Sequence, residues 1–196
     1  MVVPVSAGIA PPAFDPTAGV FLAQGARPAG LAAVDVAALS PYQRSLLVID
    51  GTVTRFIEAY WLEPVEVRRI SQEEMRLGAA EPWLDIAAGE LAIRRRVLLL
   101  GGRSGRLYAW ADTLMVAARL QPEVRRGLDH EGGGLGRILI DTGAETRREG
   151  LWFGREQPAA HPVEVAALCT GPWLTRSYRV VAGGRPLMQI TERFPP

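Results

Sequence analysis

The last strand-like segment of the chain places one carboxylate among apolar side chains. In the stretch GGRPLMQITERF, residues 183–194, successive side chains of a β-strand would point to opposite faces. One face carries Leu187, Gln189, Thr191 and Arg193. The other carries Met188, Ile190, Glu192 and Phe194. A buried carboxylate that lacks a partner is costly. Glu192 therefore either has a role inside the protein or is turned outward by a bulge or a sheet edge.

Two β-hairpins are predicted by strand-like runs that flank glycine-rich turns. LAIRRRVLLL, residues 91–100, and RLYAWADTLMV, residues 106–116, lie on either side of GGRSG. LTRSYRVVA, residues 174–182, and RPLMQITERF, residues 185–194, are joined by a glycine pair that permits positive φ angles. Antiparallel strands are therefore expected to dominate the fold.

Helices and further strands are expected around these hairpins. Ser40 as N-cap and Pro41 at the first helical position predict a helix that ends at Asp50–Gly51. Thr52 is a candidate cap for a second helix, which has apolar residues at helical spacing. The other expected elements are a strand over 63–71, a helical or irregular cover over 72–90, a helix and turn over 116–130, an apolar segment over 131–140, a short strand over 144–156 and a helix over 161–169.

These elements predict an α+β fold in which helices cover one face of a single antiparallel sheet. The chain of 196 residues is long enough for one domain with a sizeable core. We expect that domain to span residues 39–196. Residues 1–38 are rich in Pro, Ala and Gly and are expected to form an extension that is partly disordered or wrapped on the surface.

Composition excludes several classes of function. The net charge of +1 gives no basis for binding nucleic acid or an anionic membrane surface. Every basic side chain is arginine, and the absence of lysine excludes Schiff-base chemistry and a Walker-type phosphate loop.

The cysteine and histidine residues indicate where the protein is located and whether it binds a metal ion. Cys169 is the single cysteine, so no intrachain disulfide can form and a reducing, cytoplasmic location is expected. The start MVVPVSAGIAPPAF lacks the features of a signal peptide, and no apolar run has transmembrane length. His130 and His161 lack the spacing of zinc ligands, so we expect loop residues and no metal site.

The arginine triplet in IRRRVLLL is the second candidate for chemistry. Arg95 shares a strand face with Ile93 and Val97, whereas Arg94 and Arg96 share the opposite face with other apolar residues. A buried arginine cannot lose its proton and needs an anion. That anion is either a carboxylate of the protein, for which Glu192 is a candidate, or the carboxylate of a ligand.

A third candidate is the turn GGGLGR at residues 132–137. Glycines allow the backbone to approach an anion closely, although loop flexibility explains such a turn equally well. No Ser-His-Asp set stands out, and no second carboxylate lies on a strand face to pair with Glu192 for glycoside hydrolysis. The pattern alone indicates an α+β domain with a small anionic ligand.

The order of four sequence blocks resembles the chorismate lyase (chorismate pyruvate-lyase) family, and most closely its cyanobacterial and actinobacterial branch. The blocks are DGTVTRFIEAYWLEPVEV, RRRVLLLGGRSG, LGRILI and LTRSYRVVAGGRPLMQITERFP, within roughly residues 40–195. The resemblance implies an antiparallel sheet of about six strands with helices on one side and an enclosed ligand. It also implies conversion of chorismate to 4-hydroxybenzoate and pyruvate, no metal or organic cofactor, and a monomer.

The resemblance also assigns roles to the candidates. Arg95 would bind a carboxylate of the ligand, and Glu192 would be the acidic residue of the last strand. Backbone N–H groups near Thr52, Leu135 and Gly136 would bind the ring carboxylate.

One feature departs from the family pattern. The family's second arginine is replaced here by Asp112, so another cation would have to meet the second carboxylate of chorismate. The substitutes in the sequence are Arg137, Arg176 and Arg179. The departure keeps two alternatives open, a relative that forms a different product such as 3-hydroxybenzoate, and a non-catalytic domain similar to effector domains of bacterial transcription regulators.

Overall fold

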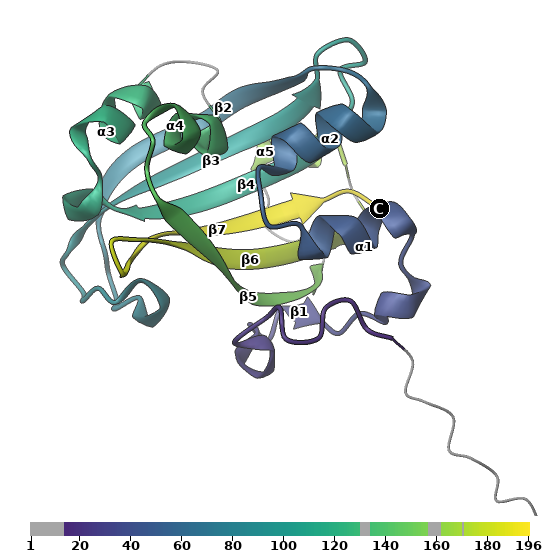
Figure 1. The fold of residues 1–196 in the computed structure, drawn as a ribbon, viewed down its shortest axis with the longest axis horizontal. Coiled ribbons are helices and arrows are strands. Elements are labelled where there is room, and N and C mark those ends of the chain that lie inside the picture. The colour runs from purple at the N-terminus through teal and green to yellow at the C-terminus, as the bar shows by residue number, and fades with distance from the viewer. Residues whose placement is uncertain (1–13, 130–133, 157–161, 170) are drawn as a thin grey trace, which may run out of the picture.

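A seven-stranded antiparallel sheet, in the order β1-β5-β6-β7-β4-β3-β2, forms the centre of the molecule (Figure 1). The structure is a computed structural model that describes residues 14–129, 134–156, 162–169 and 171–196. The strands are β1 (Leu31–Ala32), β2 (Val65–Arg76), β3 (Leu91–Gly101), β4 (Leu107–Val116), β5 (Thr146–Glu156), β6 (Trp173–Ala182) and β7 (Arg185–Phe194). The predicted α+β class is confirmed, with seven strands in place of about six.

The two predicted hairpins are confirmed as β3–β4 and β6–β7. Gly183 and Gly184 form the second turn with φ angles of 55° and 76°, a region that L-residues rarely adopt. Strands β4 and β7 then pair with each other, so that Ala111 lies opposite Glu192. This pairing joins the two hairpins in the middle of the sheet.

Helices cover one face of the sheet, as Figure 1 shows. They are α1 (Pro41–Val48), α2 (Val53–Trp61), α3 (Pro122–Asp129) and α4 (Leu135–Asp141). A fifth short helix, α5 (Val163–Ala166), differs from the expectation of helices on one face only. Its Val165 packs with Leu98, Leu100 and Trp110, which strand alternation turns to the opposite face. Short 3₁₀ segments complete the elements: η1 (Gln24–Ala26), η2 (Val36–Ala38), η3 (Pro82–Leu84) and η4 (Ala117–Arg119).

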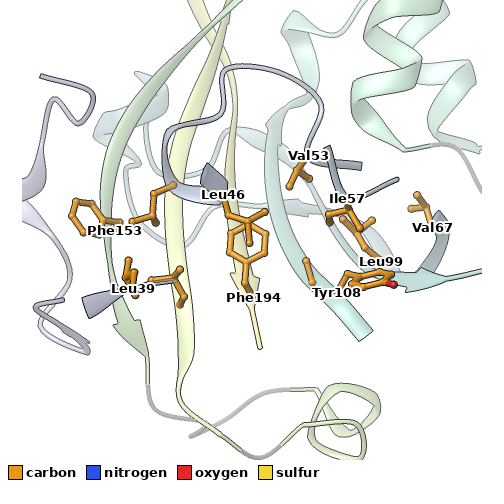
Figure 2. Close-up of a cluster of buried hydrophobic side chains, with 12 residues drawn as sticks. Leu39, Leu46, Val53, Ile57, Val67, Leu99, Tyr108, Phe153 and Phe194 are labelled. Carbon is orange, nitrogen blue, oxygen red and sulfur yellow. The ribbon is translucent and has the colours of Figure 1, made fainter. Parts of the chain in front are cut away.

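Helix α1 begins where the sequence predicts. The Ser40 side chain accepts a hydrogen bond from the backbone N–H of Gln43, and the Gln43 side chain accepts one from the backbone N–H of Ser40. This capping box satisfies two N–H groups that have no partner within the helix. Leu46 and Leu47 of α1 are fully buried against the sheet in the cluster drawn in Figure 2. This part of the core thus lies between α1, α2 and the strands beneath them.

Strand β2 is longer than its sequence pattern indicates. Residues 72–76 belong to the segment expected to be helical or irregular, but they continue β2 as far as Arg76. Pairing with β3 along the whole strand overrides the weak local pattern. Polar residues are tolerated there because β2 lies at the sheet edge with one side open to solvent. The strand expected within residues 144–156 is confirmed as β5.

Residues 14–38 lie along the opposite edge of the sheet. Leu31 of β1 pairs with Glu156 of β5, and the Gln24 side chain bonds the backbone of Phe153 through both its oxygen and its nitrogen. Ala23 and Leu31 pack with Leu151 and Trp152 of β5. The described part of the expected extension is therefore attached to the sheet. Within the described residues, no helix is long and apolar enough to cross a membrane.

Candidate active site

A pocket lies between the sheet and the first turns of α2 and α4. Its space for the centre of a water molecule is about 60 Å³, several times the ~10–15 Å³ that one water needs. Strands β3, β4, β6 and β7 supply its floor, mostly through apolar side chains. The polar side chains that line the pocket are Thr52, Thr54, Arg95, Thr113, Arg148, Tyr178 and Glu192.

Glu192 lies on the floor of the pocket with an exposed fraction of 4%. Its Oε2 accepts a hydrogen bond of 2.8 Å from Nε of Arg176, and its Oε1 accepts one of 3.1 Å from the hydroxyl of Tyr178. Alternation along β7 therefore buries this carboxylate, and neither a bulge nor a sheet edge turns it outward. The partner of Glu192 is Arg176 of the adjacent strand β6, so of the two alternatives for the anion at Arg95, the one in which Glu192 supplies it is wrong.

Arg176 lies behind Glu192 and is itself buried. Its Nη1 donates to the backbone carbonyl of Ile49, at 3.0 Å, in the turn that follows α1. Among the described residues, its Nη2 is buried without a hydrogen-bond partner. Because Arg176 is absent from the lining of the pocket, it acts on a ligand only through Glu192.

Tyr178 is the second donor to Glu192. Burial, and next the negative charge of Glu192, raise the pKa of the Tyr178 hydroxyl above its usual range. The hydroxyl therefore stays protonated and donates to the carboxylate. Among the residues that the structure describes, Glu192 meets two hydrogen-bond donors and no acceptor, which suits the acceptor role of a carboxylate.

Arg95 lies on β3 at the far side of the floor, with an exposed fraction of 2%. Its Nη1 donates to Oε1 of Gln72, at 2.5 Å, and to the carbonyl of Leu128, at 3.0 Å, in the last turn of α3. Burial, and next the charge of Arg69, lower the pKa of Arg95, although an arginine still keeps its proton. A fixed positive charge thus faces the pocket from the strand that the triplet indicated.

Thr52, Leu135 and Gly136 form the roof of the pocket. Thr52 is the N-cap of α2, and Leu135 and Gly136 open α4, so their surroundings include N–H groups that have no acceptor within a helix. A Cβ atom at Gly136 would lie 2.8 Å from Oγ1 and Cγ2 of Thr52. The two turns therefore meet closely because position 136 has no side chain.

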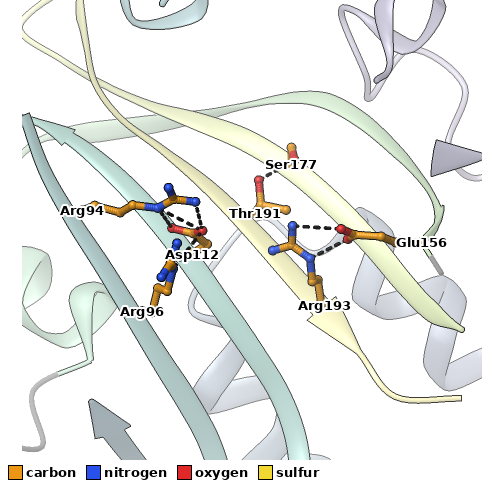
Figure 3. Close-up of polar contacts among 7 residues, drawn as sticks. All are labelled: Arg94, Arg96, Asp112, Glu156, Ser177, Thr191 and Arg193. Atoms are coloured by element: carbon orange, nitrogen blue, oxygen red, sulfur yellow. Dashed lines mark hydrogen bonds and ion pairs between the residues drawn. The ribbon is translucent and has the colours of Figure 1, made fainter. Parts of the chain in front are cut away.

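Asp112 does not line the pocket. It lies on the opposite face of the sheet, where it accepts hydrogen bonds from Arg94 and Arg96 (Figure 3). Strand alternation turns its neighbours Ala111 and Thr113 toward the pocket instead. The interpretation of Asp112 as a residue at the ligand is therefore wrong.

Two of the three substitute arginines also lie away from the pocket. Arg137 is exposed and pairs with Asp141 one helical turn later in α4. Arg179 pairs with Glu149 and bonds the carbonyl of Trp83. Alternation along β6 places Arg179 on the face opposite Tyr178, so neither arginine meets a ligand in this pocket.

Arg148 and Tyr178 line the pocket but were not singled out from the sequence. Tyr178 shares the apolar face of LTRSYRVV with Leu174 and Val180, and that alternation could have identified it. The place of Arg148 at the pocket could not be predicted from alternation, because a bulge between Gly150 and Trp152 breaks the alternation along β5.

The residues that the structure describes hold no group of three or more His, Cys, Asp or Glu side chains that could bind a metal ion. His130, His161 and the glycines at 132 and 133 of the predicted turn lie outside the described residues.

A comparison with protein families gives the site a context. The family model described as chorismate pyruvate-lyase, Rv2949c-like, matches residues 47–196, which include every polar residue of the pocket. The chain belongs to this family. The resemblance seen in the four sequence blocks is thereby confirmed.

Curated relatives in the chorismate pyruvate-lyase family are moderately similar. A chorismate pyruvate-lyase of Mycobacterium leprae is 28% identical over 159 residues, covering 77% of this chain and 72% of the relative. A chorismate pyruvate-lyase of Mycobacterium tuberculosis is 27% identical over 157 residues, covering 77% of this chain and 78% of the relative.

Solved structures with a similar fold include effector domains of transcription regulators. The effector domain of PhnF from Mycobacterium smegmatis has a TM-score of 0.58 at 16% identity, covering 74% of this chain and 88% of that chain. The C-terminal domain of the histidine utilization repressor from Pseudomonas syringae has a TM-score of 0.52 at 13% identity, covering 67% of this chain and 91% of that chain. At this identity the likeness concerns the fold alone.

Proposed function

We propose that this pocket converts chorismate to 4-hydroxybenzoate and pyruvate. The observation that carries the proposal is Glu192, a buried carboxylate that faces the same apolar pocket as the buried Arg95. Membership of the chorismate pyruvate-lyase family supports the choice of substrate. Every atom of both products comes from chorismate, so the reaction needs positioning and proton transfer but no co-substrate.

Arg95 and the backbone N–H groups near Thr52, Leu135 and Gly136 bind the ring carboxylate of chorismate in this proposal. A guanidinium group and N–H groups together match the two oxygens of a carboxylate. The apolar side chains between them and Glu192 contact the faces of the ring. The ring is thereby oriented with its C3–C4 edge toward Glu192.

Glu192 then removes the proton at C4. The electrons of the C4–H bond form a ring double bond, the C3–O ether bond breaks, and its electron pair leaves with the enolpyruvate oxygen. The ring becomes aromatic, and enolpyruvate takes up a proton to give pyruvate. Arg176 and Tyr178 support the role of a base because both donate hydrogen bonds to the carboxylate.

We also propose that the chain acts as a cytoplasmic monomer, without a metal or organic cofactor and without nucleic acid. The single cysteine and the near-neutral charge support this setting.

The test is incubation of the purified protein with chorismate, followed by chromatography of aromatic products and an enzymatic assay for pyruvate. We expect 4-hydroxybenzoate and pyruvate in equal amounts, above the spontaneous background. Absence of both products would overturn the proposal, and 3-hydroxybenzoate would indicate the alternative product of the same family.

The fold of the PhnF effector domain supports a second candidate, a domain that binds an aromatic acid without turnover. Tight binding of 4-hydroxybenzoate together with a complete lack of pyruvate release would favour this candidate.

A further inference from the structure

Arg148 is a cation at the edge of the pocket whose charge the proposed chemistry does not use. It lies on β5 opposite Val180 of β6, and both residues line the pocket. Arg148 also lines the adjoining depression next to Gly51, Thr52 and Gly136. It is therefore located where β5 meets the first turns of α2 and α4.

The guanidinium of Arg148 lacks the partners that its neighbours have. Arg147 pairs with Glu149 at 2.6 Å, and Arg179 donates to the same carboxylate at 2.6 Å. Within the described part of the chain, Nε of Arg148 is buried and has no hydrogen-bond partner. A buried donor without an acceptor is costly, which points to an acceptor that a ligand supplies.

The charges around the pocket favour a ligand with two negative groups. Among the described residues, Arg95 and Arg148 line the pocket together with a single carboxylate, Glu192, which Arg176 already engages. Ala111 and Thr113 are the β4 residues that face the pocket, so β4 provides no cation there. Four strand spacings of about 4.8 Å lie between β3 and β5, so the two arginines approach the pocket from opposite sides of Glu192.

We infer that Arg148 binds the enolpyruvyl carboxylate of chorismate and so selects a diacid whose second carboxylate is joined to ring C3. This inference rests on the proposed function, since it places the ring carboxylate at Arg95. The order Arg95, Glu192, Arg148 across the sheet puts the C3 substituent on the side of Arg148 when the C3–C4 edge faces Glu192. The positive charge of Arg148 lies close enough to Tyr178 to oppose the rise in the pKa of that hydroxyl.

A pair of stable ligands tests the inference by calorimetry. 3-(Carboxymethoxy)benzoate carries the second carboxylate, and 3-methoxybenzoate lacks it but keeps the ring, the ring carboxylate and the ether. The wild-type protein should bind the diacid about 10-fold or more tightly than the monoacid, as expected for a charge-assisted hydrogen bond. In Arg148→Gln this preference should disappear, while the affinity for 3-methoxybenzoate stays within about twofold.

Two further variants serve as controls. Arg147→Gln removes the neighbouring arginine, which faces the other way and is largely exposed, and should keep the preference. Arg148→Lys keeps the positive charge and should keep part of the preference for the diacid. In each variant, binding of the monoacid 3-methoxybenzoate reports whether the pocket is folded.

The outcomes separate this inference from the proposed function. Retention of the diacid preference by Arg148→Gln, or its absence in the wild-type protein, would overturn the role of Arg148 alone. Failure of the wild-type protein to bind either benzoate would overturn the proposed function and this inference with it. With chorismate, Arg148→Gln should raise KM by about 10-fold or more and leave kcat nearly unchanged.

Discussion

At the scale of single residues, Glu192 is the group on which the proposed chemistry depends. Substitution Glu192→Gln keeps the volume and an acceptor for Arg176 but removes the ability to take a proton. We expect kcat for 4-hydroxybenzoate formation to fall by at least about 100-fold, the lower end of general-base contributions. Initial rates at saturating chorismate measure the effect.

The matched control for Glu192→Gln is Glu149→Gln. Glu149 is also an arginine-paired carboxylate on a strand, but it pairs with Arg147 and Arg179 away from the pocket. This variant should retain the wild-type rate. Full turnover by Glu192→Gln would remove Glu192 from the mechanism even if the activity itself were established.

Arg95 should contribute to the binding of the ring carboxylate. Substitution Arg95→Gln removes the charge and should weaken 4-hydroxybenzoate binding by about 10- to 100-fold, because a hydrogen bond to a charged group contributes about 1.5–3 kcal/mol. Calorimetric titration gives the dissociation constant. Arg94→Gln alters the adjacent arginine, which pairs with Asp112 on the other face, and should bind like the wild type. Equal affinity in both variants would contradict the role of Arg95.

Sequence alternation could identify which side chains face inward but not which of them meet. It singled out Glu192 and Arg95 because each interrupts an apolar face. It predicted the β6–β7 hairpin but not the register shift between Val180 and Val181, which places Arg176 opposite Glu192. Alternation does not identify Arg148 as a pocket residue, because one extra residue in β5 shifts the register of the side chains of that strand.

At the scale of elements, Glu63 stabilises the turn between β3 and β4. Its carboxylate accepts hydrogen bonds from the backbone N–H groups of Arg103 and Ser104, each at 3.1 Å, and from the hydroxyls of Ser104 and Tyr108. The hydrogen bond from Tyr108, followed by those from Ser104, lowers the pKa of Glu63 from 4.5 to about 2. The folded protein therefore holds this carboxylate in its charged form.

The lowered pKa predicts how the turn responds to acid. Below pH 4.5 the unfolded chain binds a proton at Glu63 before the folded protein does, so this stabilisation is present above that pH and is lost as the pH falls toward about 2. Urea unfolding should show Glu63→Gln less stable than the wild type at pH 7, with a difference that shrinks between pH 5 and pH 2.5. Glu66→Gln changes an exposed carboxylate and should show no such trend. A difference independent of pH would contradict the assignment.

The elements differ in how well local sequence predicts them. The two hairpins and α1 could be predicted because turn glycines, strand alternation and a capping box act over short distances. The second half of β2 could not, because its polar residues become a strand only through pairing with β3. Helix α5 was expected, but its place on the opposite face depends on tertiary packing.

At the scale of the whole molecule, residues 14–38 connect to the strand that carries Arg148. Gln24 bonds both the N–H and the carbonyl of Phe153, which is buried in β5. Substitution Gln24→Ala leaves both backbone groups without these partners and should lower the free energy of unfolding by about 1–3 kcal/mol. Urea titration measures the loss.

Gln121→Ala makes the same change at an exposed glutamine and should be neutral. Unchanged stability in Gln24→Ala would mean that residues 14–38 contribute little to the folded domain.

The pocket itself is a property of the whole chain. Its polar groups come from α2 and from β3, β4, β5, β6 and β7, and the order of these strands in the sheet differs from their order in the sequence. Composition and alternation alone indicated a small anionic ligand, and only the family resemblance supplied chorismate. The family model that matches residues 47–196 covers every polar residue of the pocket.

A crystal structure with bound 4-hydroxybenzoate would test the central claim most directly, namely that Arg95 and Glu192 address opposite ends of one ring in this pocket. We predict the carboxylate of the ligand within about 3.2 Å of the Arg95 guanidinium and the ligand hydroxyl on the side of Glu192. A ligand bound outside the pocket, or bound with its carboxylate at Glu192, would contradict the account.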